Sequence, residues 1–110
     1  MNDSELVSLA EALREAGELL QKHGDRYTSE RIKQAENRLR AGDTSAIVTA
    51  FSEATGGMGS LNDRYLCPQN DDAIGLQDVV PVNDRLSRLV REVERRARVA
   101  AAAHRIALLH

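Results

Sequence analysis

Apolar residues in the last third of the chain recur every three to four positions, and this spacing constrains the fold more than any other feature. From Asn83 onward the set is Leu86, Leu89, Val90, Val93, Ala97, Ala100, His104 and Leu108. A period near 3.5 residues places them all on one side of an α-helix. We therefore predict a long C-terminal helix of about 26 residues, with Asn83 as its N-cap, because Asn side chains accept hydrogen bonds from the first turn.

Three earlier segments carry the same periodicity and predict shorter helices. Each is bounded by residues that favour helix ends, with Ser, Thr or Asp at the start and, for the first two, Gly at the end. The predicted starts and ends are Asp3 or Ser4 to Gly24, Thr28 or Ser29 to Gly42, and Asp43 or Thr44 to Ala54. Gly17, inside the first helix, predicts the close approach of a neighbouring helix.

The chain of 110 residues predicts a single domain over residues 1–110, because two separate cores of roughly 50 residues each would be marginal. Aromatic residues make up only 3%, which disfavours a large β-sandwich. We predict an all-α fold, an irregular bundle of four main helices plus one short helix. Residues 66–82 contain both prolines and show no period, so they predict a long loop.

The residues that usually carry chemistry are scattered. Cys67 is the only cysteine and has no neighbouring base, which disfavours a disulfide, a Cys-rich zinc site and a thiolate nucleophile. The histidines do not cluster in the sequence: His23, His104 and His110. A row of carboxylates at helical spacing predicts a solvated face: Glu11, Glu15 and Glu18. We therefore expect no catalytic residue, no metal and no cofactor.

The first twenty residues lack a basic region followed by an apolar core, which is the pattern of a secretory signal. No run approaches the length of about 18 apolar residues that a membrane-spanning helix needs. Together with the single cysteine, these observations favour the cytoplasm as the location and predict no membrane partner.

The most unusual local sequence is GGMGSLND, in which three glycines fall within four positions. Its residues are the first candidate binding set: Gly56, Gly57, Met58, Gly59, Ser60, Leu61, Asn62 and Asp63. Ser60 and Asp63 have the spacing of a capping box, so we predict a helix stop, a turn and a short helix through Leu66. Two interpretations stay open: a turn that presents its backbone to a partner, or a cradle of N–H groups for phosphate. The Lys-Ser/Thr of a P-loop is missing.

This octet, followed by Arg64-Tyr65-Leu66, resembles the hallmark of an uncharacterised family of small bacterial proteins, a domain of unknown function. The other matching features are Leu39 with Gly42-Asp43, an inward Phe51, and Asn83 with Leu86. The resemblance implies a small all-α protein of the bacterial cytoplasm. It also implies a link to immunity proteins, which inhibit secreted toxins. The pair Arg64-Tyr65 departs from the family pattern, in which a more apolar pair is expected.

Charge is distributed unevenly along the chain. Residues 84–110 carry a net charge of +4 and residues 1–83 carry −6. One interpretation places the basic last helix on the acidic remainder of the same molecule. The other makes the arginines of one helix face a binding site for an acidic partner or nucleic acid. The second candidate binding set is therefore Arg91, Arg95 and Arg98.

The expected function is non-catalytic protein–protein interaction, with an immunity-like inhibitor of a toxin as its specific form. The alternatives are a small-ligand or anion-binding domain that uses the Gly-rich turn, and a nucleic-acid accessory protein that uses the arginines. Nucleic acid is disfavoured by the acidic pI near 5.9, the few aromatics and a third helix without Lys or Arg. We also predict a homodimer through the apolar seam of the last helix, toward Ile106, Leu108 and Leu109.

Overall fold

The computed structural model describes residues 3–109, so the prediction for His110 lies outside the described residues. This part of the chain forms four α-helices and three short 3₁₀ turns, and it contains no strand. The helices are α1 (Ser4–Lys22), α2 (Arg26–Arg40), α3 (Ala46–Thr55) and α4 (Val79–Ala103). The turns are η1 (Leu61–Asp63), η2 (Pro68–Asn70) and η3 (Leu76–Asp78). The prediction of an all-α bundle with a long C-terminal helix is confirmed.

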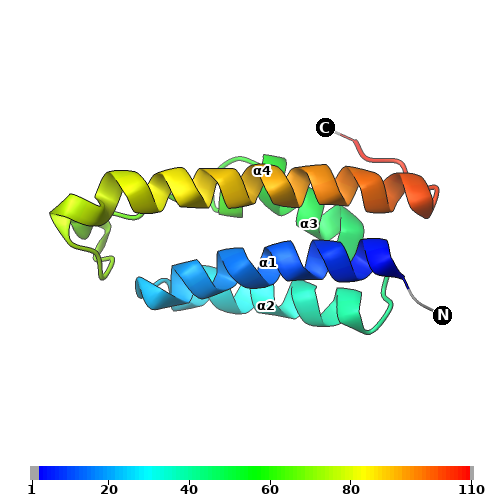
Figure 1. Ribbon diagram of the computed structural model, residues 1–110, viewed down its shortest axis with the longest axis horizontal. Coiled ribbons are helices and arrows are strands. Elements are labelled where there is room, and N and C mark those ends of the chain that lie inside the picture. Colours follow the sequence, from blue (N-terminus) through cyan, green and yellow to red (C-terminus); the bar gives the residue numbers. More distant parts are fainter. Residues whose placement is uncertain (1–2, 110) are drawn as a thin grey trace.

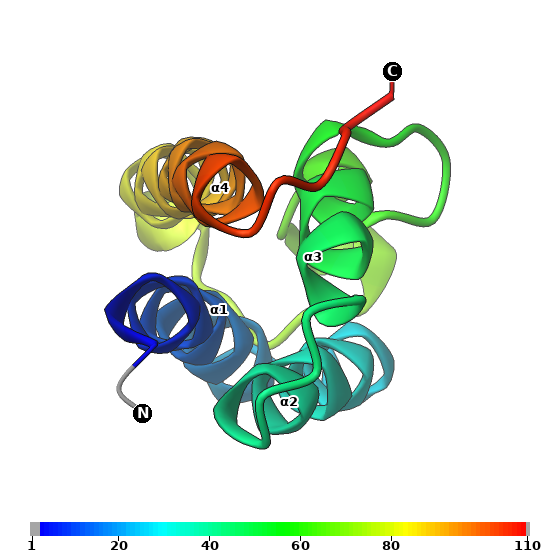
Figure 2. The ribbon, with the colours of Figure 1, turned by 90° about the vertical axis from the view of Figure 1, so that its right-hand side faces the viewer.

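The four helices surround one apolar core. The end-on view in Figure 2 shows the helices arranged around a common centre. Helix α1 packs against α2 and α4, and the shorter α3 packs against α4 and α2 to close the bundle (Figures 1 and 2). The predicted seam of α4 is buried from Leu86 to Ala100. Phe51 of α3 is the largest fully buried side chain. A Cβ at Gly17 would lie 3.5 Å from Cγ2 of Ile32, which is an ordinary contact distance, so the packing of α2 does not require glycine there.

Three helices end in the same left-handed turn. Gly24 after α1 and Gly42 after α2 both have φ of +86°, as the sequence predicts. Arg105 takes this conformation after α4, with φ of 57°. The Ile106 N–H then donates to the Ala101 carbonyl at 2.8 Å, the long bond of a Schellman motif. Helix α4 therefore ends at Ala103, and the chain folds back toward the core.

Two predicted helix starts shift by a few residues. Helix α2 begins before Thr28 because Asp25 caps it, with Oδ1 accepting from the Thr28 N–H at 3.0 Å. Thr28 and Ser29 lie inside the helix and are buried. The N-cap of α3 is Ser45, so the prediction of Asp43 or Thr44 as its cap is wrong. The Asp43 carboxylate instead accepts from the Ser45 N–H at 3.0 Å, in the turn before the helix.

The prediction of Asn83 as an N-cap is wrong. Helix α4 starts four residues earlier, at Val79, and the first turn accommodates Pro81 because its missing N–H would have no helical partner. The Asn83 side chain instead faces the preceding segment. Its Oδ1 accepts from the Leu66 N–H at 2.8 Å, and its Nδ2 donates to the Leu66 carbonyl at 2.7 Å. The predicted loop over 66–82 is correspondingly shorter.

Residues 56–78, which we call the linker segment, join α3 to α4. The predicted helix through Leu66 is wrong: only η1 forms, and the backbone becomes extended at Arg64. The Arg64 guanidinium turns inward, with Nε 2.6 Å from a carboxylate oxygen of Asp25 and Nη2 3.3 Å from Asp72. Both carboxylates are largely buried, which explains why a charged residue stands where the resemblance leads one to expect an apolar one.

No helix within residues 3–109 combines the length and the apolar character needed to cross a bilayer.

Candidate functional site

The Gly-rich turn projects from the end of α3. Gly56 caps that helix, and a Cβ at this position would lie 2.5 Å from the Ser52 carbonyl, so the close approach requires glycine. Gly59 has φ of +85°, which also favours glycine. Gly57 has neither constraint, since a Cβ there would meet open space. Met58, which lies between Gly57 and Gly59, is 98% exposed.

The capping box predicted for Ser60 and Asp63 does not form. The Ser60 hydroxyl donates to the Gly57 carbonyl at 2.7 Å rather than accepting from the η1 backbone. Asp63 reaches back one residue further than predicted, and its Oδ2 accepts from the Gly59 N–H at 3.1 Å. Asn62 closes the base of the turn with a bond of 3.3 Å to the Gly56 carbonyl. These bonds fix the shape of the turn from within.

An ion pair between buried Glu53 and partly buried Arg31 fixes the turn to the bundle. Glu53 of α3 accepts from Arg31 of α2 at 2.5 Å and 3.0 Å, and also from the Leu61 N–H at 2.9 Å. Arg31 donates in addition to the Gly59 carbonyl at 2.8 Å. The Glu53 carboxylate raises the pKa of the Arg31 guanidinium, chiefly through these hydrogen bonds. The turn is therefore held at both Gly59 and Leu61 before any partner binds.

The sequence gives no local signal for this pair. Glu53 is buried, whereas Ser52 beside it is exposed. No local pattern links Glu53 to Arg31, which precedes it by 22 residues, and the contact exists only because α2 and α3 pack side by side. Such a pair is found from tertiary structure alone.

A phosphate cradle in the turn would need free N–H groups. The N–H of Gly59 is bonded to Asp63, that of Ser60 to the Gly57 carbonyl, and that of Leu61 to Glu53. Two of these three acceptors are carboxylates, which would repel an anion. The geometry therefore favours a turn that is stabilised internally.

Two grooves flank the turn. On the side of α2 and α3, an open groove of about 420 Å³ lies between the turn and the two helices. Its lining residues are Arg31, Val48, Thr49, Ser52, Glu53, Met58, Gly59 and Ser60. On the side of α4, a smaller groove of about 130 Å³ is lined by Leu61, Asn62, Arg64, Leu86, Ser87, Val90 and Arg91. This second groove brings part of the Gly-rich turn together with Arg91, so the two candidate sets meet there.

The arginines of the second set have different surroundings. Arg91 is exposed and makes no ion pair with residues 3–109. Arg95 pairs with Glu92 on its own helix at 2.5 Å. Arg98 pairs with Glu94 at 3.1 Å and lies over the Phe51 ring, 4.9 Å from its centroid. Arg91 and Arg95 therefore face solvent, whereas Arg98 is turned toward α3.

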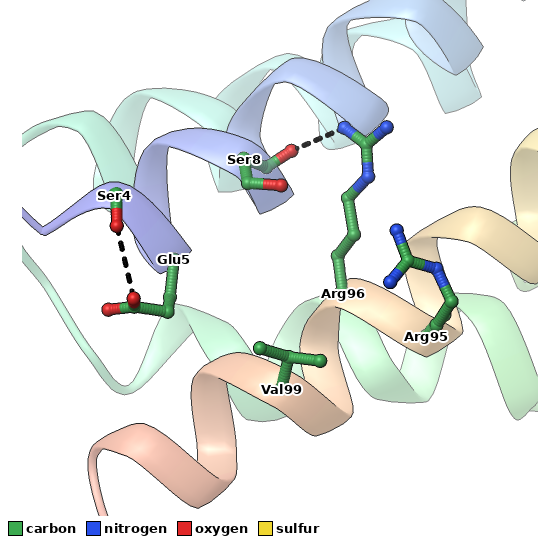
Figure 3. Close-up of a pocket in the computed structure, with 6 residues that line it drawn as sticks. All are labelled: Ser4, Glu5, Ser8, Arg95, Arg96 and Val99. Carbon is green, nitrogen blue, oxygen red and sulfur yellow. Dashed lines mark hydrogen bonds between the residues drawn. The ribbon is translucent and has the colours of Figure 1, made fainter.

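Most arginines of α4 do not pair with the acidic remainder of the molecule, contrary to the first interpretation of the charge pattern. Arg85 lies 3.9 Å from Glu15 of α1, a long contact. Arg96 crosses to α1 but donates to the Ser8 carbonyl at 2.8 Å, as Figure 3 shows. The remaining ion pairs of α4 within residues 3–109 are internal to the helix. Much of its positive charge is thus left toward solvent.

A groove between the start of α1 and α4 contains two of these arginines (Figure 3). It measures about 300 Å³ and is lined by Ser4, Glu5, Ser8, Arg95, Arg96 and Val99. Glu92 accepts hydrogen bonds from both guanidiniums, and this lowers the pKa of Glu92 to about 2. Because the cations already share a carboxylate, this groove offers little net charge to an anionic ligand.

The scattered titratable residues remain scattered in three dimensions. Within residues 3–109, no three His, Cys, Asp or Glu side chains come together as a metal site would require. His23 is buried, and its Nδ1 lies 2.7 Å from the Ala73 carbonyl. Of the carboxylate row in α1, Glu11 is bound by Arg14 and Arg40, which lower its pKa to about 2. These groups support the fold.

Comparisons with protein-family models, curated proteins and solved structures find no match for this chain.

Proposed function

We propose that the protein is a non-catalytic protein–protein interaction module, with the Gly56–Asp63 turn at the centre of its contact surface. One observation carries this proposal. A methionine that is 98% exposed lies in a turn whose backbone is fixed by a partly buried ion pair. Met side chains adapt to apolar partner surfaces, and a contact that is held in place before binding loses little conformational entropy.

The neighbourhood of Met58 supports the same function. Val48 lines the groove beside Met58 and is 44% exposed. On the preceding helix, α2, the Tyr27 side chain is 80% exposed, and the Arg31 guanidinium lies over its ring, 5.6 Å from the ring centroid. Aromatic, Met and Arg side chains are enriched in the cores of protein interfaces. The resemblance of the Gly-rich motif adds a narrower form of the proposal, an immunity-like inhibitor of a toxin in a bacterial cytoplasm.

Site-specific photocrosslinking tests the proposal directly. A benzophenone amino acid at position 58 is expected to give a discrete crosslinked species with a partner protein in cells that express the chain. The matched control carries the same group at Leu109, which is 90% exposed and belongs to the C-terminal end. The same crosslinked species from both positions, or none from position 58, would contradict the proposal.

The homodimer expected from the sequence needs a surface other than the one first inferred. The seam of α4 is buried, and Ile106 and Leu108 pack against the core, leaving Leu109 exposed. We retain the homodimer as a proposal. Light scattering on the protein at roughly tens of micromolar tests it, because dimerisation depends on protein concentration. A mass of two chains would support it, and a mass near 12.1 kDa would exclude it at that concentration.

A further inference from the structure

The exposed side of α4 carries a row of three arginines. Arg88, Arg91 and Arg95 all face solvent and repeat at spacings of three and four residues. At 1.5 Å rise per residue, the row extends about 10 Å along the helix. Arg88 and Arg91 make no ion pair with any part of residues 3–109. A protein of net charge −2 thus displays a positive row on one helix.

The row borders a groove of mixed polarity at Arg91. Its apolar lining comes from Leu61, Leu86 and Val90, which are all buried, and its polar lining comes from Asn62, Arg64, Ser87 and Arg91. Its volume of about 130 Å³ is of the order of one side chain. A partner can therefore bury one apolar side chain in the groove while its charged groups remain beside the arginines. Hot spots at interfaces combine these two features.

We propose that this row and groove dock an acidic helix of a partner protein. Carboxylates spaced at three and four residues would pair with Arg88, Arg91 and Arg95, and one apolar side chain between them would enter the groove. The inference rests on the proposed function and specifies the partner's chemistry, because the groove is shared with the Gly-rich turn.

The charge pattern favours an acidic protein over other occupants. Duplex DNA is bound through many phosphate contacts, whereas only two arginines of this row are unpaired. A second copy related by a two-fold axis across the row would place arginine against arginine, which is repulsive. An acidic helix meets neither objection.

A binding experiment with a defined probe tests the inference. The probe is an alanine-based peptide of about 15 residues with three glutamates spaced at three and four residues and one leucine between them. We expect it to shift the amide NMR signals of Asn62 and Ser87 in the isotope-labelled protein. A peptide of the same composition, scrambled so that the glutamates share no face, should bind more weakly.

Two double variants with equal net charge provide the control. Arg88→Gln with Arg91→Gln should weaken binding of the peptide by about fivefold, as expected for the loss of two exposed ion pairs. Lys22→Gln with Arg26→Gln removes two exposed cations that lie outside the row and should leave binding unchanged. Equal weakening by both variants, or no binding of the peptide at low salt, would overturn the inference.

Tighter binding of a short DNA duplex through the same arginines would also overturn it, in favour of nucleic acid. The proposed function is judged separately by the crosslink at position 58. If that crosslink forms while the Arg88 and Arg91 double variant leaves it unchanged, the interaction module stands and the acidic partner is rejected.

Discussion

The four-helix bundle and the linker segment are stabilised by different interactions. The bundle buries a continuous apolar core, with Phe51 and the α4 seam at its centre. The linker segment buries only two large apolar side chains, Leu61 and Leu66, within residues 56–78. Its irregular backbone is fixed by Glu53 and Asn83, which lie outside the segment and bond to the N–H groups of those two leucines. Irregular backbone can be ordered without a core when its polar groups find such partners.

The largest effect is expected in the bundle. Phe51→Ala should lower the free energy of unfolding by about 3–5 kcal/mol, because it removes the largest buried side chain and leaves a cavity. Chemical denaturation monitored by circular dichroism measures the loss. A loss below about 1 kcal/mol would show that α3 contributes little to the core. It would contradict the claim that apolar packing stabilises the bundle more than the linker segment.

The next effect concerns the attachment of the linker segment. Asn83→Leu keeps a similar side-chain volume but leaves the Leu66 N–H and carbonyl without their partner. We expect a loss of about 2–4 kcal/mol in unfolding free energy, because two buried backbone groups become unsatisfied. Asn83→Asp tests the donor separately. It retains an acceptor for the Leu66 N–H, but its second carboxylate oxygen would face the Leu66 and Val79 carbonyls, so this variant should also destabilise the protein.

The same contrast explains what the sequence could and could not predict. Helix positions, the seam of α4 and the glycine turns after α1 and α2 follow from local spacing and single-residue preferences. The prediction of Asn83 as an N-cap was wrong because its side chain bonds to the backbone of Leu66. That contact depends on the tertiary structure, which brings Leu66 next to α4. Arg64 and Glu53 are charged side chains that are drawn inward by distant partners, and periodicity carries no signal for such pairs.

For the candidate site, too, the sequence predicted the local features and not the tertiary ones. The GGMGSLND motif identified the turn, and helical spacing predicted one face with Arg91, Arg95 and Arg98. Arg91 and Arg95 face solvent, whereas Arg98 is turned toward Phe51 of α3. The groove between the turn and α4 was not predicted, because it depends on how η1 packs against α4.

A smaller effect separates the glycines of the turn. Gly59→Ala should destabilise the protein by about 1–2 kcal/mol, because φ of +85° is strained for a residue with a Cβ. Gly57→Ala should cause no loss, since it lies outside the left-handed region and a Cβ there would meet open space. Thermal denaturation of both variants measures the difference. Equal losses would mean that the turn is constrained in some other way.

The smallest effect is a gain. Arg105 occupies the left-handed position after α4 that glycine occupies after α1 and α2. Arg105→Gly should stabilise the protein by about 0.5–1 kcal/mol by relieving this strain. Gly24→Ala is the reverse control, and we expect it to destabilise the protein by about 1–2 kcal/mol, as for Gly59→Ala. A melting temperature that falls for Arg105→Gly would show that the Arg side chain itself supports the C-terminal turn.

The central claim is that buried polar side chains hold the linker segment in place, and amide hydrogen exchange tests it most directly. The N–H groups of Leu61 and Leu66 should both be strongly protected, since they donate to Glu53 at 2.9 Å and to Asn83 at 2.8 Å. Glu53→Ala removes only the first acceptor, so it should abolish the protection of Leu61 and leave that of Leu66 largely intact. Rapid exchange of both amides in the unmodified protein would contradict the account.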